Sequence, residues 1–166
     1  IERFNPAVLK LKELIDEGAI GKVTSLIAKR VGAFPAQIKD ANVIIDLAVH
    51  DIDIFSHLLD KEPDKIYSNS GKALISERED YAEIFLTYGD QNGFIQVNWI
   101  TPIRIRNLAI TGTKGYIELP SRFGDNLVFE NKNDHIWWFT YDDINNLLIA
   151  SKRNQLIDPF ITVSTA

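Results

Sequence analysis

The sequence contains no cysteine and no methionine among its 166 residues. Without cysteine the chain cannot form a disulfide, a thiolate zinc site or a cysteine nucleophile. Its glycines are scattered singly, so neither G-x-G-x-x-G nor G-x-x-x-x-G-K-S/T occurs, and the chain as given has no motif that cradles nucleotide phosphates. No apolar run approaches the roughly 18 residues of a membrane span and we identify no signal peptide, so we expect no membrane partner.

Positive charge is also in short supply. Lys and Arg number 18 against 23 Asp and Glu, which gives a net charge of -5. This balance argues against nucleic acid as a partner, because phosphate binding requires a basic surface. Hydrophobic residues make up 45% and charged residues 25%, as in ordinary globular proteins. We expect one domain over residues 1–166, located in the cytoplasm. Because the chain starts at Ile1 and has no Met, we also expect a missing N-terminal segment.

The first third of the chain has the spacing of helices around one strand. Helices are expected at about 5–18 and 45–60, a strand at 22–32 and a loop at 34–42. Asn5 and Pro6 have the residue types of an N-cap and a first helical position. Pro63 ends the second helical pattern.

From residue 65 the apolar period changes to two, which predicts seven short strands separated by turn residues. These strands are expected at 65–74, 80–89, 93–101, 104–113, 115–121, 126–131 and 135–141, and a last helix at about 142–155. This order predicts an α+β domain, a large open and mostly antiparallel sheet with helices on one face. The residue pattern makes neither face of the sheet plainly polar. We therefore expect a homodimer or homotetramer that forms through the sheet face without helices.

Asp46 and His50 are the first candidates for catalysis. Their four-residue separation places them on one face of the second helix. A carboxylate that accepts a hydrogen bond from one imidazole nitrogen orients the ring, and the other nitrogen can take a proton from a substrate hydroxyl. On spacing alone, however, such pairs are more often structural or solvated than catalytic. Asp53 and His57 continue the stripe, but four ligands spread over about 16 Å of helix cannot meet at one ion, so we expect no metal.

Three segments together resemble the Gfo/Idh/MocA oxidoreductases. VIIDLAVHDIDI is similar to the family's D-x-x-x-H-x-x-D segment, and IERFNPAV resembles its crossover from the Rossmann domain into the C-terminal domain. WITPIRIRNLAITGTKGYIEL resembles the sheet segment of the nucleotide-sugar members, especially those like UDP-N-acetylglucosamine 3-dehydrogenase. The resemblance spans essentially the whole chain and is weakest at its end.

The resemblance implies the C-terminal domain of an NAD(P)-dependent dehydrogenase that oxidises a secondary hydroxyl of a sugar or nucleotide sugar. It gives His50 the role of general acid and base, and Asp46 an orienting or assisting role. It also implies an N-terminal Rossmann domain, absent from this chain, that binds most of the NAD or NADP. The alternative is a non-catalytic, dimerising sheet domain in which Asp46 and His50 form a structural pair.

Five more residues are candidates for contact with the substrate. Arg104 and Arg106 lie two apart on a predicted strand and thus share a face, where they could clamp a diphosphate or carboxylate. Two such arginines more often face solvent. Arg30, Asn98 and Trp99 are the other candidates, although a tryptophan is more commonly part of a core or an interface.

Arg3 and Asn5 are candidates for contact with the cofactor, because they lie at the implied domain crossover. Asn5 is equally suited to being only an N-cap. Asp53 matches the family pattern, but we expect it to make a structural hydrogen bond.

Overall fold

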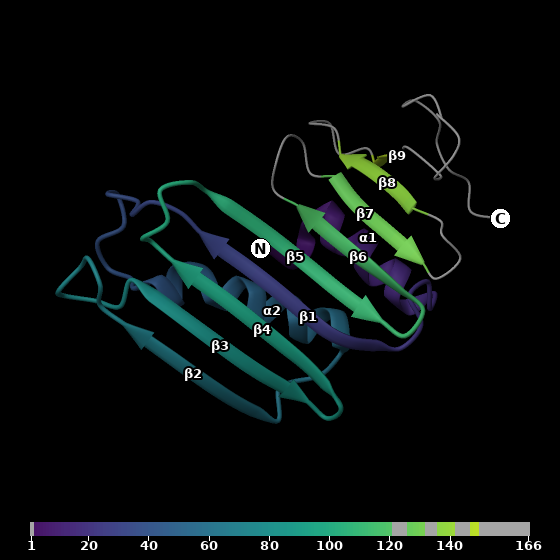
Figure 1. Cartoon of the computed structure of the whole chain (residues 1–166), viewed down its shortest axis with the longest axis horizontal. Helices are drawn as coiled ribbons and strands as arrows, with labels where there is room; N and C mark the ends of the chain where they lie inside the picture. Colours follow the sequence, from purple (N-terminus) through teal and green to yellow (C-terminus); the bar gives the residue numbers. More distant parts are fainter. Residues whose placement is uncertain (1, 121–125, 132–135, 142–146, 150–166) are drawn as a thin grey trace.

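A computed structural model describes residues 2–120, 126–131, 136–141 and 147–149 (Figure 1). The predicted helices at the start of the chain and the predicted strands are present, with ends that differ by a few residues. The elements in chain order are η1 (Glu2–Phe4), α1 (Pro6–Asp16), β1 (Val23–Val31), η2 (Ile44–Ala48), α2 (Val49–Leu59), β2 (Lys65–Gly71), β3 (Tyr81–Tyr88), β4 (Gln91–Asn98), β5 (Ile105–Gly112), β6 (Gly115–Pro120), β7 (Asn126–Asn131), β8 (Ile136–Tyr141) and β9 (Leu147–Ile149).

The strands of the described chain form one sheet in the order β2-β3-β4-β1-β5-β6-β7-β8-β9. β1 runs parallel to β4, and the other neighbouring pairs are antiparallel. Figure 1 shows α1 and α2 together behind the sheet, which leaves the near side of β1 to β5 without a helix. The predicted α+β fold, an open and mostly antiparallel sheet with helices on one face, is confirmed.

The first helix begins at the predicted cap. The Asn5 Oδ1 accepts a hydrogen bond from the Ala7 N–H at 3.0 Å, which satisfies one of the donors that a helix start leaves unpaired. Val8, Leu11 and Leu14 follow at a spacing of three and are buried. This apolar stripe holds α1 against the rest of the domain.

α2 packs on the sheet through a contact that requires glycine. A Cβ atom at Gly93 of β4 would lie 2.6 Å from the Cδ2 of Phe55, closer than carbon atoms approach one another. Because residue 93 has no side chain, Phe55 lies directly on the strand and is fully buried. Ile54 and Leu58 are buried beside it, and burial of each such side chain contributes about 1.5–3 kcal/mol. This stripe fixes the rotation of α2 about its axis, and with it the direction of the other side chains.

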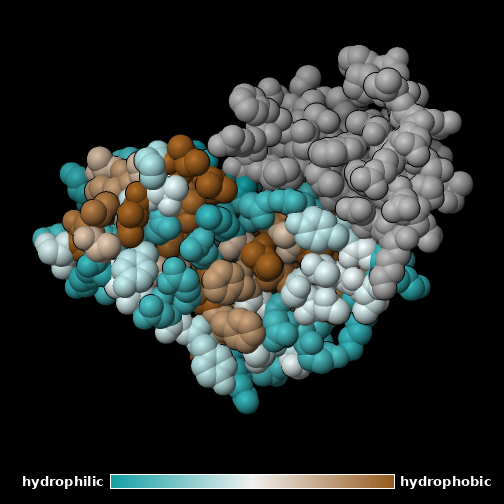
Figure 2. All heavy atoms as spheres, in the orientation of Figure 1, coloured by the Kyte–Doolittle hydropathy of each residue, from teal (hydrophilic) through white to brown (hydrophobic). Residues whose placement is uncertain are grey.

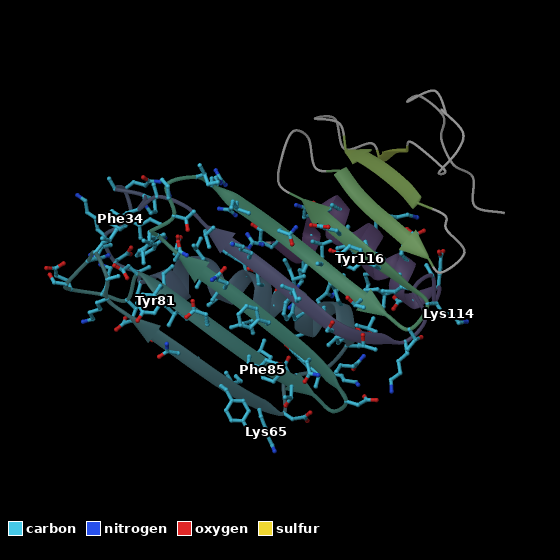
Figure 3. The ribbon with its side chains drawn as sticks, viewed as in Figure 1. Phe34, Lys65, Tyr81, Phe85, Lys114 and Tyr116 are labelled. Atoms are coloured by element: carbon cyan, nitrogen blue, oxygen red, sulfur yellow. The ribbon has the colours of Figure 1, made fainter. Side chains whose placement is uncertain are left out.

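The helix-free face carries an apolar row across four strands. The register places Tyr67 opposite Phe85, Phe85 opposite Phe94, and Phe94 beside Ile27. Their exposed fractions are 57%, 40%, 37% and 48% in that order. Figure 3 labels Phe85 on this face, and Figure 2 shows apolar surface there among polar residues. We call these four residues the open-face row.

The prediction of a closing helix is wrong where the structure describes that segment. Leu147–Ile149 form β9, which pairs antiparallel with β8. Three consecutive apolar residues suit a short strand as well as a helix, so the pattern alone did not separate the two. The remaining residues of the predicted helix lie outside the described part of the chain.

Candidate active site

A cleft of about 530 Å³ lies where the ends of β1 and β4, the start of β5 and the first turns of the η2–α2 helix meet. β1 and β4 are parallel, so their C-terminal ends reach the same edge of the sheet. Six of the predicted site residues line this cleft: Arg30, Asp46, His50, Trp99, Arg104 and Arg106. The structure thus brings together residues that the sequence places in three separate segments.

Asp46 and His50 reach the cleft from different kinds of helix. Asp46 lies in the π-helical turn η2, where the Val49 N–H donates to the Ile44 carbonyl five residues back. His50 lies in α2, one residue after this turn ends. A π-turn widens the helix locally, so a spacing of four no longer stacks two side chains as it does in an α-helix. The two residues line the same cleft, but no hydrogen bond joins them, contrary to the predicted pair.

The start of η2 is anchored by Asn42. Its Oδ1 accepts a hydrogen bond from the Ile45 N–H at 3.0 Å, and its Nδ2 donates to Glu79 at 2.9 Å. The Val43 N–H also donates to the Glu79 carbonyl, at 3.1 Å. These bonds fix the beginning of the helix, and therefore Asp46, against the segment that leads into β3.

Arg30 forms a buried ion pair with Asp51, a residue that the sequence interpretation missed. The Arg30 Nε donates to both carboxylate oxygens of Asp51 at 2.8 Å. Arg30 is 8% exposed and Asp51 2%. Burial raises the pKa of Asp51, and the charge and hydrogen bond of Arg30 oppose this shift without cancelling it. The pair holds the guanidinium against α2 at the inner wall of the cleft.

A usable sequence signal for Asp51 was present. Asp51, Ile54, Phe55 and Leu58 are spaced three, four and seven apart, so the aspartate lies on the buried apolar stripe of α2. A carboxylate on such a stripe needs a partner, because burying an unpaired charge is costly. Glu2, which was also missed, lines the cleft, and one of its oxygens lies 3.6 Å from the Arg30 Nη2.

Arg106 of β5 and Arg104, two residues earlier, add two guanidinium groups to that of Arg30. We call these three residues the cationic wall. The register of β1 and β5 places Arg106 directly opposite Arg30. Arg104 lies just before the first residue of β5 and lines the same cleft as Arg106. Burial lowers the pKa of Arg106, and the nearby charges of Arg30 and Arg104 lower it further. Three guanidinium groups therefore share one region despite their mutual repulsion.

Trp99 closes the cleft at the end of β4. It is 3% exposed, and its ring meets that of Phe34 edge-on, with centroids 5.2 Å apart and planes at 67°. Phe34, labelled in Figure 3, belongs to the loop after β1. Within the described residues the buried Trp99 Nε1 has no hydrogen-bond partner. The indole thus combines a core position with a donor that lacks an acceptor.

Asn98 does not line the cleft. Its Oδ1 accepts hydrogen bonds from the backbone N–H groups of Ile100 and Thr101 at 3.1 and 3.0 Å and from the Thr101 hydroxyl at 2.9 Å. Neighbouring residues of a strand point to opposite faces, so Trp99 and Asn98 cannot both face one ligand from β4. The structure gives Asn98 a turn-forming role outside the cleft, and its predicted substrate contact stays a prediction.

Arg3 and Asn5 lie next to the cleft without entering it. The Arg3 Nε donates to Asp53 at 2.9 Å, and a second bond from its Nη2 completes an exposed bidentate pair. This hydrogen bonding, which opposes some desolvation, lowers the pKa of Asp53. The predicted structural bond of Asp53 is confirmed. Asn5 caps α1, and the predicted cofactor contacts of Arg3 and Asn5 stay predictions.

A second cavity of about 290 Å³ adjoins the cleft. It shares Glu2, Arg30, Arg104 and Arg106 with the cleft, and it adds Asp51. The cationic wall therefore borders two neighbouring hollows. Asp46 and His50 line the first, and Asp51 lines the second.

The described residues contain neither a group of metal ligands nor a helix that could span a membrane. No three or more His, Asp and Glu side chains gather there in a way that could hold a metal ion. No helix in that part of the chain has the length and apolar character needed to span a membrane.

Comparison with known proteins gives a family match over most of the chain. Residues 8–118 match the GFO/IDH/MocA C-terminal domain. Over 97 residues the chain is 30% identical to inositol 2-dehydrogenase 2 of Saccharopolyspora erythraea, which covers 57% of this chain and 29% of that protein. The chain thus spans less than a third of the length of this relative.

Solved structures have the same fold. An inositol dehydrogenase homolog of Azotobacter vinelandii, complexed with NADH and myo-inositol, matches with a TM-score of 0.72 at 12% identity, over 84% of this chain and 40% of that one. The WlbA dehydrogenase of Bordetella pertussis, in complex with NADH and UDP-GlcNAcA, matches with a TM-score of 0.66 at 18% identity, over 78% of this chain and 44% of that one.

Proposed function

Because this chain belongs to the GFO/IDH/MocA family, by its C-terminal domain, we propose that it is the substrate-side domain of an NAD(P)-dependent sugar dehydrogenase. The observation that carries this proposal is the convergence of His50, Asp46 and three arginines on one cleft. A histidine beside a carboxylate can manage a proton, and arginines can hold the oxygens of a polar substrate.

The chemistry that we assign to this chain is proton transfer at a secondary hydroxyl of the sugar. The C–H bond of such a carbon breaks easily only if the O–H proton leaves with it, so a base must lie within hydrogen-bond reach of the oxygen. His50 supplies this base as a neutral imidazole, and general base catalysis of this kind contributes about 10²–10⁴-fold to the rate. We assign Asp46, which lines the same cleft, an assisting role in this transfer.

The hydride acceptor that we propose is the nicotinamide of NAD or NADP. This chain does not fit the dinucleotide phosphates, because it lacks a glycine-rich turn before a helix. We therefore assign most of the cofactor binding to an N-terminal Rossmann domain outside this chain. Any contact from Arg3 or Asn5 is secondary to it.

For the substrate we propose a nucleotide sugar of the UDP-N-acetylglucosamine type. The support is the sequence resemblance of residues 99–119 to nucleotide-sugar members and the fold shared with a dehydrogenase complexed with UDP-GlcNAcA. The 30% identity to an inositol dehydrogenase instead favours a polyol. Binding measurements with both ligand classes decide between them.

Exchange of His50 in the full-length enzyme tests the catalytic role. We expect His50→Ala to lower kcat at least about 100-fold, while the Kd of NAD(P) measured by fluorescence titration stays near the wild-type value. His57→Gln is the matched control, because His57 lies on the same helix but does not line the cleft. An unchanged kcat in His50→Ala would remove the assignment of this base.

A non-catalytic sheet domain that dimerises is the second candidate. Two observations favour it: no hydrogen bond joins Asp46 to His50, and the open-face row exposes aromatic rings on a wide sheet. Loss of self-association on disrupting the row, together with full activity of His50→Ala, would favour this candidate over the dehydrogenase.

A further inference from the structure

The three arginines are arranged in a way that costs stability. Arg30 and Arg106 are direct cross-strand neighbours, and like charges at such positions repel one another. Arg104, just before β5, adds a third charge that lines the same two cavities. Burial and the charges of Arg30 and Arg104 lower the pKa of Arg106, and the charges of Glu2 and Asp51 oppose this shift without cancelling it. An arginine at this position despite the repulsion points to a functional reason.

Three carboxylates lie around the three guanidinium groups. Glu2 and Asp46 line the cleft, and Glu2 and Asp51 line the second cavity, so the two hollows together have three acidic and three arginine side chains. Asp51 is already bonded to the Arg30 Nε. In a chain with a net charge of -5, three arginines that line the same two hollows are a local concentration of cationic side chains.

Arg30 is fixed in place while most of its donors are not used by Asp51. A guanidinium has five N–H donors, and Asp51 receives only the one on Nε. One Nη2 contact, to Glu2, is long at 3.6 Å. The pair with Asp51 therefore fixes the orientation of the Arg30 guanidinium, while Asp51 does not use the donors on its two Nη atoms. Trp99, in the same cleft, has a buried Nε1 donor without an acceptor among the described residues.

We propose that Arg30, Arg104 and Arg106 form a subsite for an anionic substituent of the sugar, and that they are specificity-determining residues for acidic substrates. This inference rests on the proposed function, because it names the substrate class of the same cleft. The shared chemistry is a carboxylate or phosphate group, whose oxygens accept parallel hydrogen bonds from arginine. A neutral polyol has no charged oxygens to accept such bonds.

Titration calorimetry of the full-length enzyme with three probes tests the subsite. The probes are UDP-N-acetylglucosamine for the phosphate source, glucuronate for the carboxylate source and N-acetylglucosamine as the neutral counterpart. We expect the better anionic probe to bind at least about tenfold more tightly than the neutral sugar and to weaken with added salt. Which anionic probe binds more tightly identifies the source. Binding of both anions no tighter than the neutral sugar overturns the proposal.

Substitutions of the arginines show which side chains bind the anionic probe. Arg104→Gln and Arg106→Gln should each weaken the better anionic probe about tenfold and change binding of the neutral sugar less than about twofold. Arg104→Lys keeps the charge and should recover part of the loss. Lys65→Gln removes a charge on the strand β2, outside both cavities, and should leave binding unchanged. Wild-type binding of the anion by both arginine variants overturns the assignment.

The stability of these variants separates lost binding from misfolding. Since the two like charges beside Arg106 offset what its own contacts contribute, Arg106→Gln should have a thermal unfolding midpoint close to that of the wild type. Equilibrium binding involves neither cofactor nor turnover. If the anion preference is present while His50→Ala retains full activity, the proposed catalysis fails and the subsite stands; the reverse result rejects the subsite alone.

Discussion

The covered face of the sheet buries charge, whereas the open face exposes aromatic rings. Beneath α2, Arg30 and Asp51 are 8% and 2% exposed, while Tyr67 and Phe85 on the other side are 57% and 40% exposed. Charged residues are rarely buried unless paired, and contiguous apolar surface on a protein commonly marks an interaction site. The covered face thus buries charged residues that are usually exposed, and the open face exposes aromatic residues that are usually buried. We interpret the charges as serving a ligand, and we propose that the rings of the open-face row serve a second copy of the chain.

Removal of Asp51 should have the largest effect. Asp51→Ala leaves the buried Arg30 Nε without its acceptor, and loss of one partner of a buried pair costs about 3–5 kcal/mol. Urea unfolding of the wild type and the variant measures this difference. Asp51→Asn, which keeps an oxygen acceptor while removing a charge that burial disfavours, should cost less than half as much.

The exposed pair on the same helix is the control for this experiment. Asp53→Ala breaks the hydrogen bonds to Arg3, but surface pairs contribute less than about 1 kcal/mol. Equal losses of unfolding free energy in Asp51→Ala and Asp53→Ala would mean that the buried pair of Arg30 and Asp51 stabilises the fold no more than the exposed pair of Arg3 and Asp53.

A charge in the open-face row should have the next largest effect. Phe85 lies in the middle of the row, and a central aromatic residue of an interface is commonly worth about 2 kcal/mol or more. Phe85→Glu should therefore weaken self-association at least about 30-fold, measured by light scattering after size exclusion over a range of concentrations.

The control for the open face is Leu74→Glu. Leu74 is 72% exposed but lies between β2 and β3, outside the open-face row. We expect it to leave the assembly unchanged. A wild-type chain that is monomeric at every concentration would show that a second copy does not cover this face.

The smallest effects should appear as opposite pH dependences of Asp51 and Asp53. The folded pKa of Asp51 lies above the usual 3.8, so the stability of the wild type relative to Asp51→Asn should fall as the pH rises through that raised pKa. The folded pKa of Asp53 lies below 3.8, so the stability relative to Asp53→Asn should fall as the pH drops through it.

Denaturant unfolding of the wild type and both asparagine variants from pH 3 to 6 measures the two slopes. For the exposed Asp53 the difference should stay below about 1 kcal/mol. Slopes of the same sign would contradict the distinct electrostatic environments of the two carboxylates.

Local patterns predicted most of the fold and part of the site. Asn5 and Pro6 mark the start of α1, and the change to a period of two at residue 65 marks the strands. Asp46, His50 and the arginines were predicted one segment at a time, from residue chemistry and the family resemblance. Their meeting in one cleft depends on the sheet order, which no local pattern contains.

The misses follow from physical features that residue spacing does not show. The π-turn at Ile44–Ala48 changes how Asp46 is phased against His50, and nothing in the residue types of this turn announces it. Asn98 was paired with Trp99 as a ligand contact, although the alternation of strand side chains would have separated them. Asp51 lies on the apolar stripe of α2, apart from the polar stripe on which the catalytic candidates were predicted.

The position of β1 at the centre of the sheet also sets when the candidate site can form. β1 pairs with β4 and β5, and Arg30 meets a partner strand residue about 75 positions later in the chain, Arg106. At the roughly 5–20 residues per second of protein synthesis, about 4–15 s separate the appearance of these two residues. Contacts so distant in sequence also slow folding, because a long loop must close before they form. The cationic wall is therefore a late product of folding, completed only after the helices that cover it have been made.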